Sequence, residues 1–477
     1  MTTPHYDWMS DDLRTLSRQG PVHFMGICGA GMSALAELLV RSGGMVSGCD
    51  LRPGITGHAL RALGVTVDGG HAAAHVDEAV ALIITSAIPH RHPEIQAARE
   101  RGIPVLKRAQ ALGAIVNTGT VLAVAGTHGK TTTTAAATAI LEAADLDPTG
   151  LVGGRMLGWG GGLRAGHSDI FVVEADEYDR SFLELRPEAA VVTNVEADHL
   201  DIYGDLSGVE GAFTEFLSKV QPGGLIAVCG DDAGARRIGA AAAGTGMVLT
   251  YGTGEDAQLR ATDVSQQGGI MRFTVVDRGA TLGAITLGAP GVHNVRNALG
   301  AFALARHAGA TLDAARTALA TFSGVSRRFQ VLGTASGISV IDDYAHHPTE
   351  IVATIEAARG AYPDRRVVAA FQPHLYSRTR DLANEFGRAL ALADRVWITD
   401  VFAAREEPFP GVDGGLVVRA AMAAGADSVT YAPTLEELSR GLLRELADGD
   451  VLVAMGAGDI SDMTQGLFAV LDAGAHA

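Results

Sequence analysis

Short apolar runs alternate along the chain with amphipathic or alanine-rich segments, and this alternation predicts strands and helices of an α/β protein. The runs predict strands at 21–27, 45–50, 81–85, 104–106, 121–125, 169–173, 189–193, 225–229, 338–341, 366–371, 395–399 and 451–455. Residues 250–290 instead alternate apolar and polar positions, which predicts an antiparallel excursion. Residues 291–297 precede an alanine- and leucine-rich segment that predicts a helix to Ala310. The sheets are expected to be mostly parallel.

The most informative strand ending is the segment Gly126–Thr134, which lies between the apolar run 121–125 and an alanine-rich segment. Its glycines allow backbone N–H groups to approach an anion at the start of a helix, as in a phosphate-binding loop. Lys130 adds a mobile positive charge, and Thr131 offers a hydroxyl to Mg²⁺. The loop departs from G-x-x-x-x-G-K-[ST], because Val124 stands at the first glycine position. The alternative is a glycine turn with a surface lysine.

A second glycine motif follows the first predicted strand. Gly29-x-Gly31-x-x-Ala34, with Asp50 at the end of the next strand, matches a dinucleotide fingerprint. Such loops bind other diphosphates as well, so the motif does not choose between NAD and a nucleotide-sugar diphosphate. Ser86 follows a further strand and is either a ligand contact or a solvated turn serine. His71 is interpreted as a plain surface histidine.

Acidic and basic residues follow several of the remaining strands. Four carboxylates lie within residues 174–179, directly after the run 169–173, and a Mg²⁺ ion would relieve their repulsion. The alternative is a solvated acidic loop. His199 stands among acids after another strand and is a candidate metal ligand. Residues 342–348 and 372–380 follow strands of the last third, and the basic segment 326–328 precedes them. The polar residues at these strand ends suggest a site assembled from three domains.

Length and charge narrow the classes of function. The chain of 477 residues is long enough for about three domains. Its formal net charge of −17 argues against nonspecific binding of nucleic acid or anionic membranes. The three cysteines, which are Cys28, Cys49 and Cys229, form neither a metal-spaced pair nor a disulfide framework. The polar N-terminus lacks the apolar segment of a signal peptide, and no apolar run is long enough to span a membrane. We therefore expect a cytoplasmic protein.

Taken together, these motifs resemble the Mur ligases, in the same order along the chain from about residue 20 to residue 465. The resemblance is carried by 126–132, 174–177, 194–201, 293–297, 327–329, 342–348 and 372–378. It implies three domains: a Rossmann-like one at 1–117 for the UDP substrate, an ATP-binding, P-loop NTPase-like one at 118–325, and a Rossmann-like one at 326–477 for the amino acid. It further implies ATP-driven amide formation through an acyl phosphate. Within the family, 29–36, 342–348 and 371–378 are most similar to members that join L-alanine to UDP-N-acetylmuramate.

The resemblance also assigns expected roles to individual residues. The expected catalytic residues are Lys130, Glu174, His199 and Arg327. ATP is expected at Gly126, Thr127, His128, Gly129, Lys130, Thr131, Thr132, His293, Asn297, Arg327 and Asp343. Mg²⁺ is expected at Thr131, Glu174 and His199. The UDP substrate is expected at Gly29, Ala30, Gly31, Met32, Ser33, Asp50 and Ser86, and L-alanine at His347 and Arg378.

Other functions remain open at this point. A sibling that joins a tripeptide to UDP-N-acetylmuramate shares the acidic stretch 174–179. An NAD-linked oxidoreductase would explain the Gly29 motif but leaves Lys130 and its loop without a role. A non-enzymatic nucleotide-binding regulator is the third alternative. The expected partners are small molecules, without nucleic acid or membrane, and the chain is expected to be a monomer or homodimer. The first lysine after His199 is Lys219, so no carbamylated lysine is expected.

Overall fold

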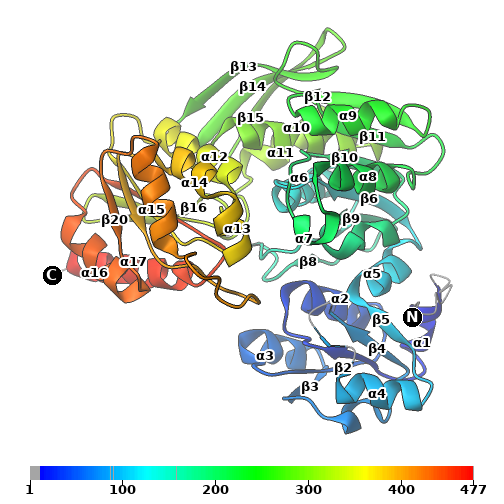
Figure 1. Ribbon diagram of the computed structural model, residues 1–477. Helices are drawn as coiled ribbons and strands as arrows, with labels where there is room; N and C mark the ends of the chain where they lie inside the picture. The colour runs from blue at the N-terminus through cyan, green and yellow to red at the C-terminus, as the bar shows by residue number, and fades with distance from the viewer. Residues whose placement is uncertain (1–10, 86–87, 90, 157, 476–477) are drawn as a thin grey trace. The chain divides into compact units, whose positions relative to one another are not determined.

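The computed structural model describes residues 11–85, 88–89, 91–156 and 158–475 (Figure 1). The chain divides into two compact units, one formed by 1–262, 274–285 and 296–319 and the other by 263–273, 286–295 and 320–477. Its strands form three sheets. No helix in the described part of the chain is both long and apolar enough to cross a bilayer.

The first sheet is parallel throughout and has the strand order β3-β2-β1-β4-β5. Its strands are β1 (Val22–Met25), β2 (Val46–Asp50), β3 (Thr66–Gly69), β4 (Ala81–Ile84) and β5 (Val105–Lys107). The helices of this region are α1 (Asp11–Leu16), α2 (Ala30–Arg41), α3 (Gly54–Ala62), η1 (Ala73–Val76), α4 (Pro93–Glu100) and α5 (Arg108–Val116). Residues of η1 and α4 pack with Met25, Leu82 and Ile84 in one apolar cluster, so these two elements cover one face of the sheet.

The second sheet has the order β15-β14-β13-β12-β11-β10-β6-β9-β7-β8. Its strands are β6 (Thr120–Ala125), β7 (Thr149–Leu151), β8 (Leu163–Arg164), β9 (Ile170–Glu174), β10 (Ala189–Val192), β11 (Leu225–Cys229), β12 (Met247–Gly252), β13 (Leu259–Gln267), β14 (Ile270–Asp277) and β15 (Ala280–Leu287). The accompanying helices are α6 (Lys130–Ala143), η2 (Tyr178–Glu184), α7 (Leu200–Tyr203), α8 (Leu206–Leu217), α9 (Ala233–Ala241), α10 (Val292–His307) and α11 (Leu312–Ala320). Strand β6 pairs in parallel with β9 on one side and β10 on the other, so the ends of three strands meet beside the loop that follows it.

The third sheet has the order β16-β17-β21-β18-β19-β20 and is parallel except for β16. Its strands are β16 (Gln330–Ala335), β17 (Ile338–Asp343), β18 (Val367–Phe371), β19 (Arg395–Ile398), β20 (Val429–Tyr431) and β21 (Val451–Met455). Its helices are α12 (Pro348–Ala361), α13 (Tyr376–Asp381), α14 (Ala383–Leu390), α15 (Gly414–Ala423), α16 (Leu435–Glu445) and α17 (Ile460–Ala475). Two apolar clusters lie on its two faces, as expected for a sheet covered by helices on both sides.

The predicted α/β fold with mostly parallel sheets is confirmed, and a strand occurs at each apolar run. The alternating stretch folds as β13, β14 and β15, which are sheet neighbours joined by two-residue turns and therefore antiparallel. Short strands that the pattern did not predict include β3, β8, β16 and β20, all at sheet edges. The helix expected after 291–297 begins earlier, at Val292, so His293 and Asn297 lie on α10 itself.

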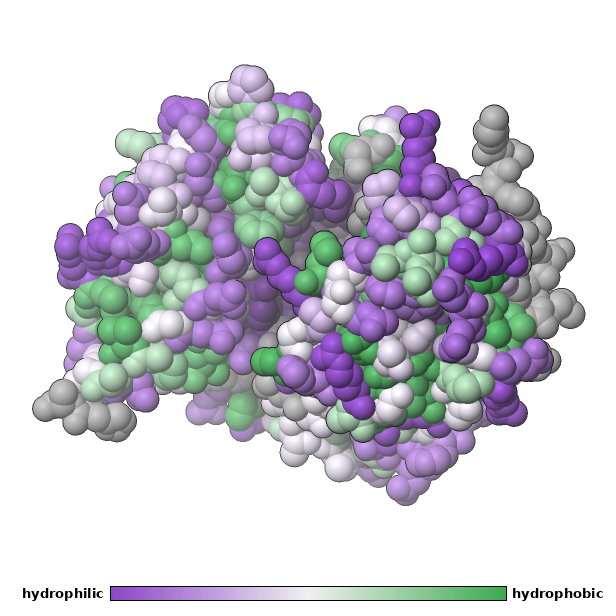
Figure 2. Space-filling view, turned by 90° about the horizontal axis from the view of Figure 1, so that it is seen from below, coloured by the Kyte–Doolittle hydropathy of each residue, from purple (hydrophilic) through white to green (hydrophobic). Residues whose placement is uncertain are grey.

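Apolar and hydrophilic residues are mixed on the face of the molecule that Figure 2 shows. Figure 2 shows hydrophilic and apolar residues interspersed over the coloured part of one face, rather than one continuous apolar area. Apolar residues scattered in this way are normal on protein surfaces and do not indicate a partner.

Candidate active site

Two glycines shape the loop between β6 and α6. Gly126 has φ +138° and Gly129, which precedes the helix, has φ +81°. A Cβ atom on Gly126 would collide with Thr193 Oγ1, and one on Gly129 would lie 2.6 Å from Asn297 Oδ1. Glycine is therefore required at both positions by conformation and by space. The backbone N–H groups that begin α6 are left without intrahelical partners, as an anion-binding loop requires.

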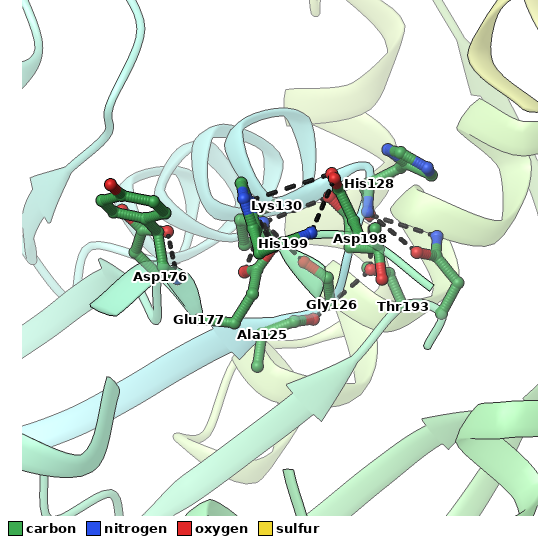
Figure 3. A network of polar contacts seen from close by, with 12 residues as sticks. Ala125, Gly126, His128, Lys130, Asp176, Glu177, Thr193, Asp198 and His199 are labelled. Atoms are coloured by element: carbon green, nitrogen blue, oxygen red, sulfur yellow. Dashed lines mark hydrogen bonds and ion pairs between the residues drawn. The ribbon is translucent and has the colours of Figure 1, made fainter. Parts of the chain in front are cut away.

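Lys130 is the centre of the polar network at this loop (Figure 3). Its Nζ donates to both carboxylate oxygens of Glu177, at 2.7 and 3.0 Å, and to the carbonyl oxygens of Gly126 at 2.6 Å and Thr127 at 3.2 Å. Burial alone would lower the pKa of Lys130, but Glu177 and Asp176 outweigh it, and the pKa is raised. The ammonium group is thus held charged where a phosphate would meet the loop.

Glu174, at the carboxyl end of β9, lies beside the start of α6. Its Oε1 accepts from the backbone N–H of Gly153 at 2.9 Å. Burial raises its pKa, while that hydrogen bond, the charge of Lys130 and a hydrogen bond with Thr131 act in the opposite direction. A carboxylate and a hydroxyl in contact, with Asp176 nearby, are oxygen donors of the kind that Mg²⁺ prefers. These residues therefore fit a Mg²⁺ site.

His199 lies next to Glu177. Its backbone is left-handed, with φ +53°, and it immediately precedes α7. Its Nε2 is 3.9 Å from Glu177 Oε1 and 3.8 Å from Asp198 Oδ2, and its ring meets Tyr178 edge-on. Lys130 and His199 thus both lie beside one buried carboxylate, that of Glu177. Glu177 belongs to the acidic stretch 174–179, where nothing in the sequence distinguishes it from its neighbours.

The end of β10 fixes the other side of the loop. The backbone N–H of His128 donates to Asn194 Oδ1 at 2.8 Å. The carbonyl oxygen of His128 accepts from Thr193 Oγ1 at 2.5 Å. Thr127 Oγ1 accepts from the backbone N–H of Glu196 at 3.0 Å. Thr132 is buried in the first turn of α6. These bonds hold the loop in shape.

A cavity of about 270 Å³ joins the Gly31 motif to the acidic end of β9. Its lining includes Gly31, Arg108, Gly153, Glu174 and Asp176. Arg108 Nη2 lies 3.5 Å from Asp176 Oδ2. Arg108 is not among the residues expected from the sequence, although its place two positions after the predicted strand 104–106 is an indication of such a role. An anionic ligand in this cavity would meet the guanidinium group of Arg108 on one side and the oxygen donors of Glu174 and Asp176, which suit Mg²⁺, on the other.

The other residues expected to bind the UDP substrate surround the start of α2. Gly29 precedes this helix, which begins with Ala30. Met32 is buried in it, and Ser33 Oγ donates to the carbonyl oxygen of Ala30 at 3.1 Å. Asp50 Oδ2 accepts from the backbone N–H of Cys28 at 3.1 Å, which ties the end of β2 to the glycine loop. Ser86 lies outside the described residues.

Four further expected residues lie in the last third of the chain, within the second unit. Arg327 Nη2 donates to the carbonyl oxygen of Gly456 at 2.7 Å, and its guanidinium lies over the Tyr344 ring at 4.9 Å. Asp343 accepts from the backbone N–H groups of Phe329 and Ala345, and burial raises its pKa to about 6. His347 precedes α12, and Arg378 is 8% exposed in α13.

Comparison with known proteins decides which family carries this arrangement. Three family models match: "Mur ligase family, catalytic domain" at 21–120, "Mur ligase middle domain" at 124–305 and "Mur ligase, glutamate ligase domain" at 327–458. The chain belongs to the Mur ligase family. Among its relatives, the UDP-N-acetylmuramate–L-alanine ligase of Salinibacter ruber is 44% identical, with 94% of this chain and 95% of that protein covered. The enzyme of the same name from Acidithiobacillus ferrooxidans is 46% identical, with 93% and 96% covered.

Solved Mur ligase structures show the same fold. The UDP-N-acetylmuramate–alanine ligase of Thermotoga maritima matches with a TM-score of 0.81 at 28% identity, covering 95% of this chain and all of that one. A murein peptide ligase from Psychrobacter arcticus matches with a TM-score of 0.69 at 26% identity, covering 95% and 99%. The resemblance inferred from the motifs is confirmed.

Proposed function

We propose that this Mur ligase joins L-alanine to the carboxylate of UDP-N-acetylmuramate at the expense of ATP. The observation that carries the proposal is similarity to L-alanine ligases, at 44–46% identity, along more than nine-tenths of the chain. The structures point the same way, because the alanine ligase gives a TM-score of 0.81 and the peptide ligase 0.69. The three cysteines are free, which supports the cytoplasm as the proposed compartment.

The ATP phosphates are proposed to bind the loop 126–132 at the start of α6. Phosphoryl transfer depends mainly on positioning and on neutralising charge, and Lys130 is held charged at this loop. Thr131 and Glu174 would hold Mg²⁺, with His199 as a further candidate ligand. The ion, when bound, would neutralise phosphate charge. His293, Asn297 and Asp343 remain proposed contacts of ATP, and Arg327 a proposed contact of the γ-phosphate.

UDP-N-acetylmuramate is proposed to bind through its diphosphate at the Gly29–Ser33 loop and to extend into the cavity beside Arg108. The cavity reaches Glu174, so a carboxylate lying there would be near the proposed phosphoryl donor. The muramyl carboxylate would take the γ-phosphoryl group and release ADP. The L-alanine amine would then attack the acyl carbon and release phosphate. Arg378 is proposed to hold the alanine carboxylate, with His347 nearby in the amino-acid site.

The test is phosphate release from ATP, measured with UDP-N-acetylmuramate and one amino acid or tripeptide at a time. L-alanine is expected to give the highest kcat/KM, and mass spectrometry is expected to show UDP-N-acetylmuramoyl-L-alanine. A preference for the tripeptide L-alanyl-γ-D-glutamyl-meso-diaminopimelate would instead identify a peptide ligase. Phosphate release that does not depend on the UDP substrate would overturn the ligase assignment altogether.

A further inference from the structure

A second cluster of chemically reactive side chains lies in the first sheet, on the face covered by η1 and α4. It consists of His23 on β1, Cys49 on β2, His75 on η1 and Glu94 on α4. One ligand atom from each of the four lies within 4.8 Å of all the others. The proposed ligase reaction uses none of them.

Three of the four side chains are buried, and His75 is partly buried. Glu94 and Cys49 are 0% exposed and His23 is 1% exposed. Apolar residues of the same face, including Met25, Val76 and Ile95, pack in one cluster with Cys49. A carboxylate in such surroundings is costly to bury unless positive charge compensates it.

The polar contacts converge on Glu94. Its Oε1 is 2.9 Å from His75 Nδ1 and accepts from the backbone N–H of Ala72 at 2.8 Å. Cys49 Sγ lies 3.4 and 3.5 Å from the two carboxylate oxygens and 3.1 Å from His71 Nδ1. The interpretation of His71 as a plain surface residue is therefore wrong, because it packs against the Cys49 thiol.

His23 supplies an independent observation. Its Nδ1 is 2.9 Å from Ser47 Oγ, whereas its buried Nε2 has no hydrogen-bond partner among the described residues. If Nδ1–H donates to Ser47, the lone pair of Nε2 is available to a metal, and Ser47 orients the ring as outer partners of metal-bound histidines do.

We propose that His23, Cys49, His75 and Glu94 bind a divalent transition metal of the zinc class. One thiolate, two imidazoles and one carboxylate suit tetrahedral Zn²⁺. Zn–S and Zn–O bonds of about 2.3 and 2.0 Å in a tetrahedron place sulfur and oxygen about 3.5 Å apart. The distances from Cys49 Sγ to the Glu94 oxygens, 3.4 and 3.5 Å, agree with that spacing.

Charge balance favours the same ion. Cys49 would bind a metal ion as the thiolate, after losing its thiol proton. Binding of M²⁺ would release that proton, and the charges of thiolate, carboxylate and ion would then sum to zero. The ion would join β1 and β2 to η1 and α4. Its role would be to stabilise this part of the fold, separately from the proposed Mg²⁺ site, whose donors are oxygens.

The test uses the full chain, reduced, freed of metal with a chelator and kept in excess Mg²⁺ to occupy the oxygen site. Titration with Co²⁺ is expected to give one equivalent with a thiolate-to-cobalt charge-transfer band and the visible bands of tetrahedral cobalt. Cys49→Ser is expected to abolish the charge-transfer band. The matched control Cys229→Ser, at a buried cysteine of β11, is expected to keep it.

A graded series separates ligation from folding. Glu94→Gln is expected to weaken Zn²⁺ binding at least about 100-fold, and Ser47→Ala, which removes only the partner of His23, about 10-fold. Zn²⁺ is expected to raise the Tm of the wild type and of Cys229→Ser but not that of Cys49→Ser. Circular dichroism and ligase activity report whether each variant is folded. A folded wild type without the charge-transfer band, or a band that survives Cys49→Ser, would refute the site.

Discussion

Replacing Lys130 by methionine would leave the buried Glu177 carboxylate without its principal cation. Lys130 Nζ lies 2.7 and 3.0 Å from the two carboxylate oxygens, and the two side chains are only 15% and 5% exposed. Removing one partner of a buried ion pair costs about 3–5 kcal/mol. We expect a loss of about 3 kcal/mol in the free energy of unfolding, at the low end of that range. The reason is that His199 Nε2, 3.9 Å from Glu177 Oε1, can supply part of the missing charge.

The double variant Lys130→Met/Glu177→Gln removes the stranded charge as well. It is expected to recover about 2 kcal/mol of the lost stability, because a neutral amide costs less to bury than a carboxylate. The catalytic effect should not recover, since neither variant has a cation at the phosphate loop. Both are expected to show a kcat about 100- to 1000-fold below that of the wild type, as for other lost electrostatic contacts to a transition state.

Urea unfolding followed by circular dichroism measures the stabilities, and phosphate release under saturating substrates measures kcat. Lys219→Met, at the lysine that follows α8, is the matched control and is expected to behave like the wild type. If the double variant were no more stable than Lys130→Met, Lys130 would not stabilise the fold by compensating the charge of Glu177. If kcat recovered together with stability, Lys130 would act on the fold rather than on the phosphates.

Three further predictions concern other parts of the chain. Gly126→Ala would place a Cβ against Thr193 at the end of β10, so calorimetry should detect no ATP binding. The control Gly211→Ala in α8, where a Cβ meets nothing within 4 Å, should bind ATP normally. Arg108→Ala should raise the KM for UDP-N-acetylmuramate about 10-fold or more with little change in kcat. The exposed control Arg101→Ala should leave this KM unchanged. If Arg108→Ala had the same KM as the wild type, Arg108 would not belong to the substrate site. The raised pKa of Asp343, about 6 against 3.8, means that the folded chain holds a proton that the unfolded chain loses between these values. Relative to Asp343→Asn, the wild type should therefore gain about 2 kcal/mol in urea-unfolding free energy on going from about pH 7.5 to about pH 4.5, and a difference independent of pH would show that Asp343 titrates normally.

The fold class, the glycine-rich turn after β6 and the family can all be predicted from the amino-acid sequence. Each of these depends on residues that are close together along the chain. Continuous apolar runs predict strands that are buried on both faces. Gly126 and Gly129 indicate a turn with positive φ, which residues other than glycine rarely adopt. The edge strands β3, β8, β16 and β20 were missed, because a short strand with one neighbour needs no continuous apolar run.

Which side chains come into contact depends on the tertiary structure. Glu177 pairs with a lysine 47 positions away because β9 lies beside β6 in the sheet, and the acidic stretch alone did not indicate which of its carboxylates would do so. Arg108 lies 3.5 Å from Asp176 and lines the same cavity as Glu174, although helix α5 and strand β9 are far apart in the sequence. Cys49 and Glu94 are 45 positions apart, without metal-binding spacing, yet β2 and α4 bring them into contact. Such contacts depend on strand order, register and helix packing, which local hydrophobic patterns do not specify.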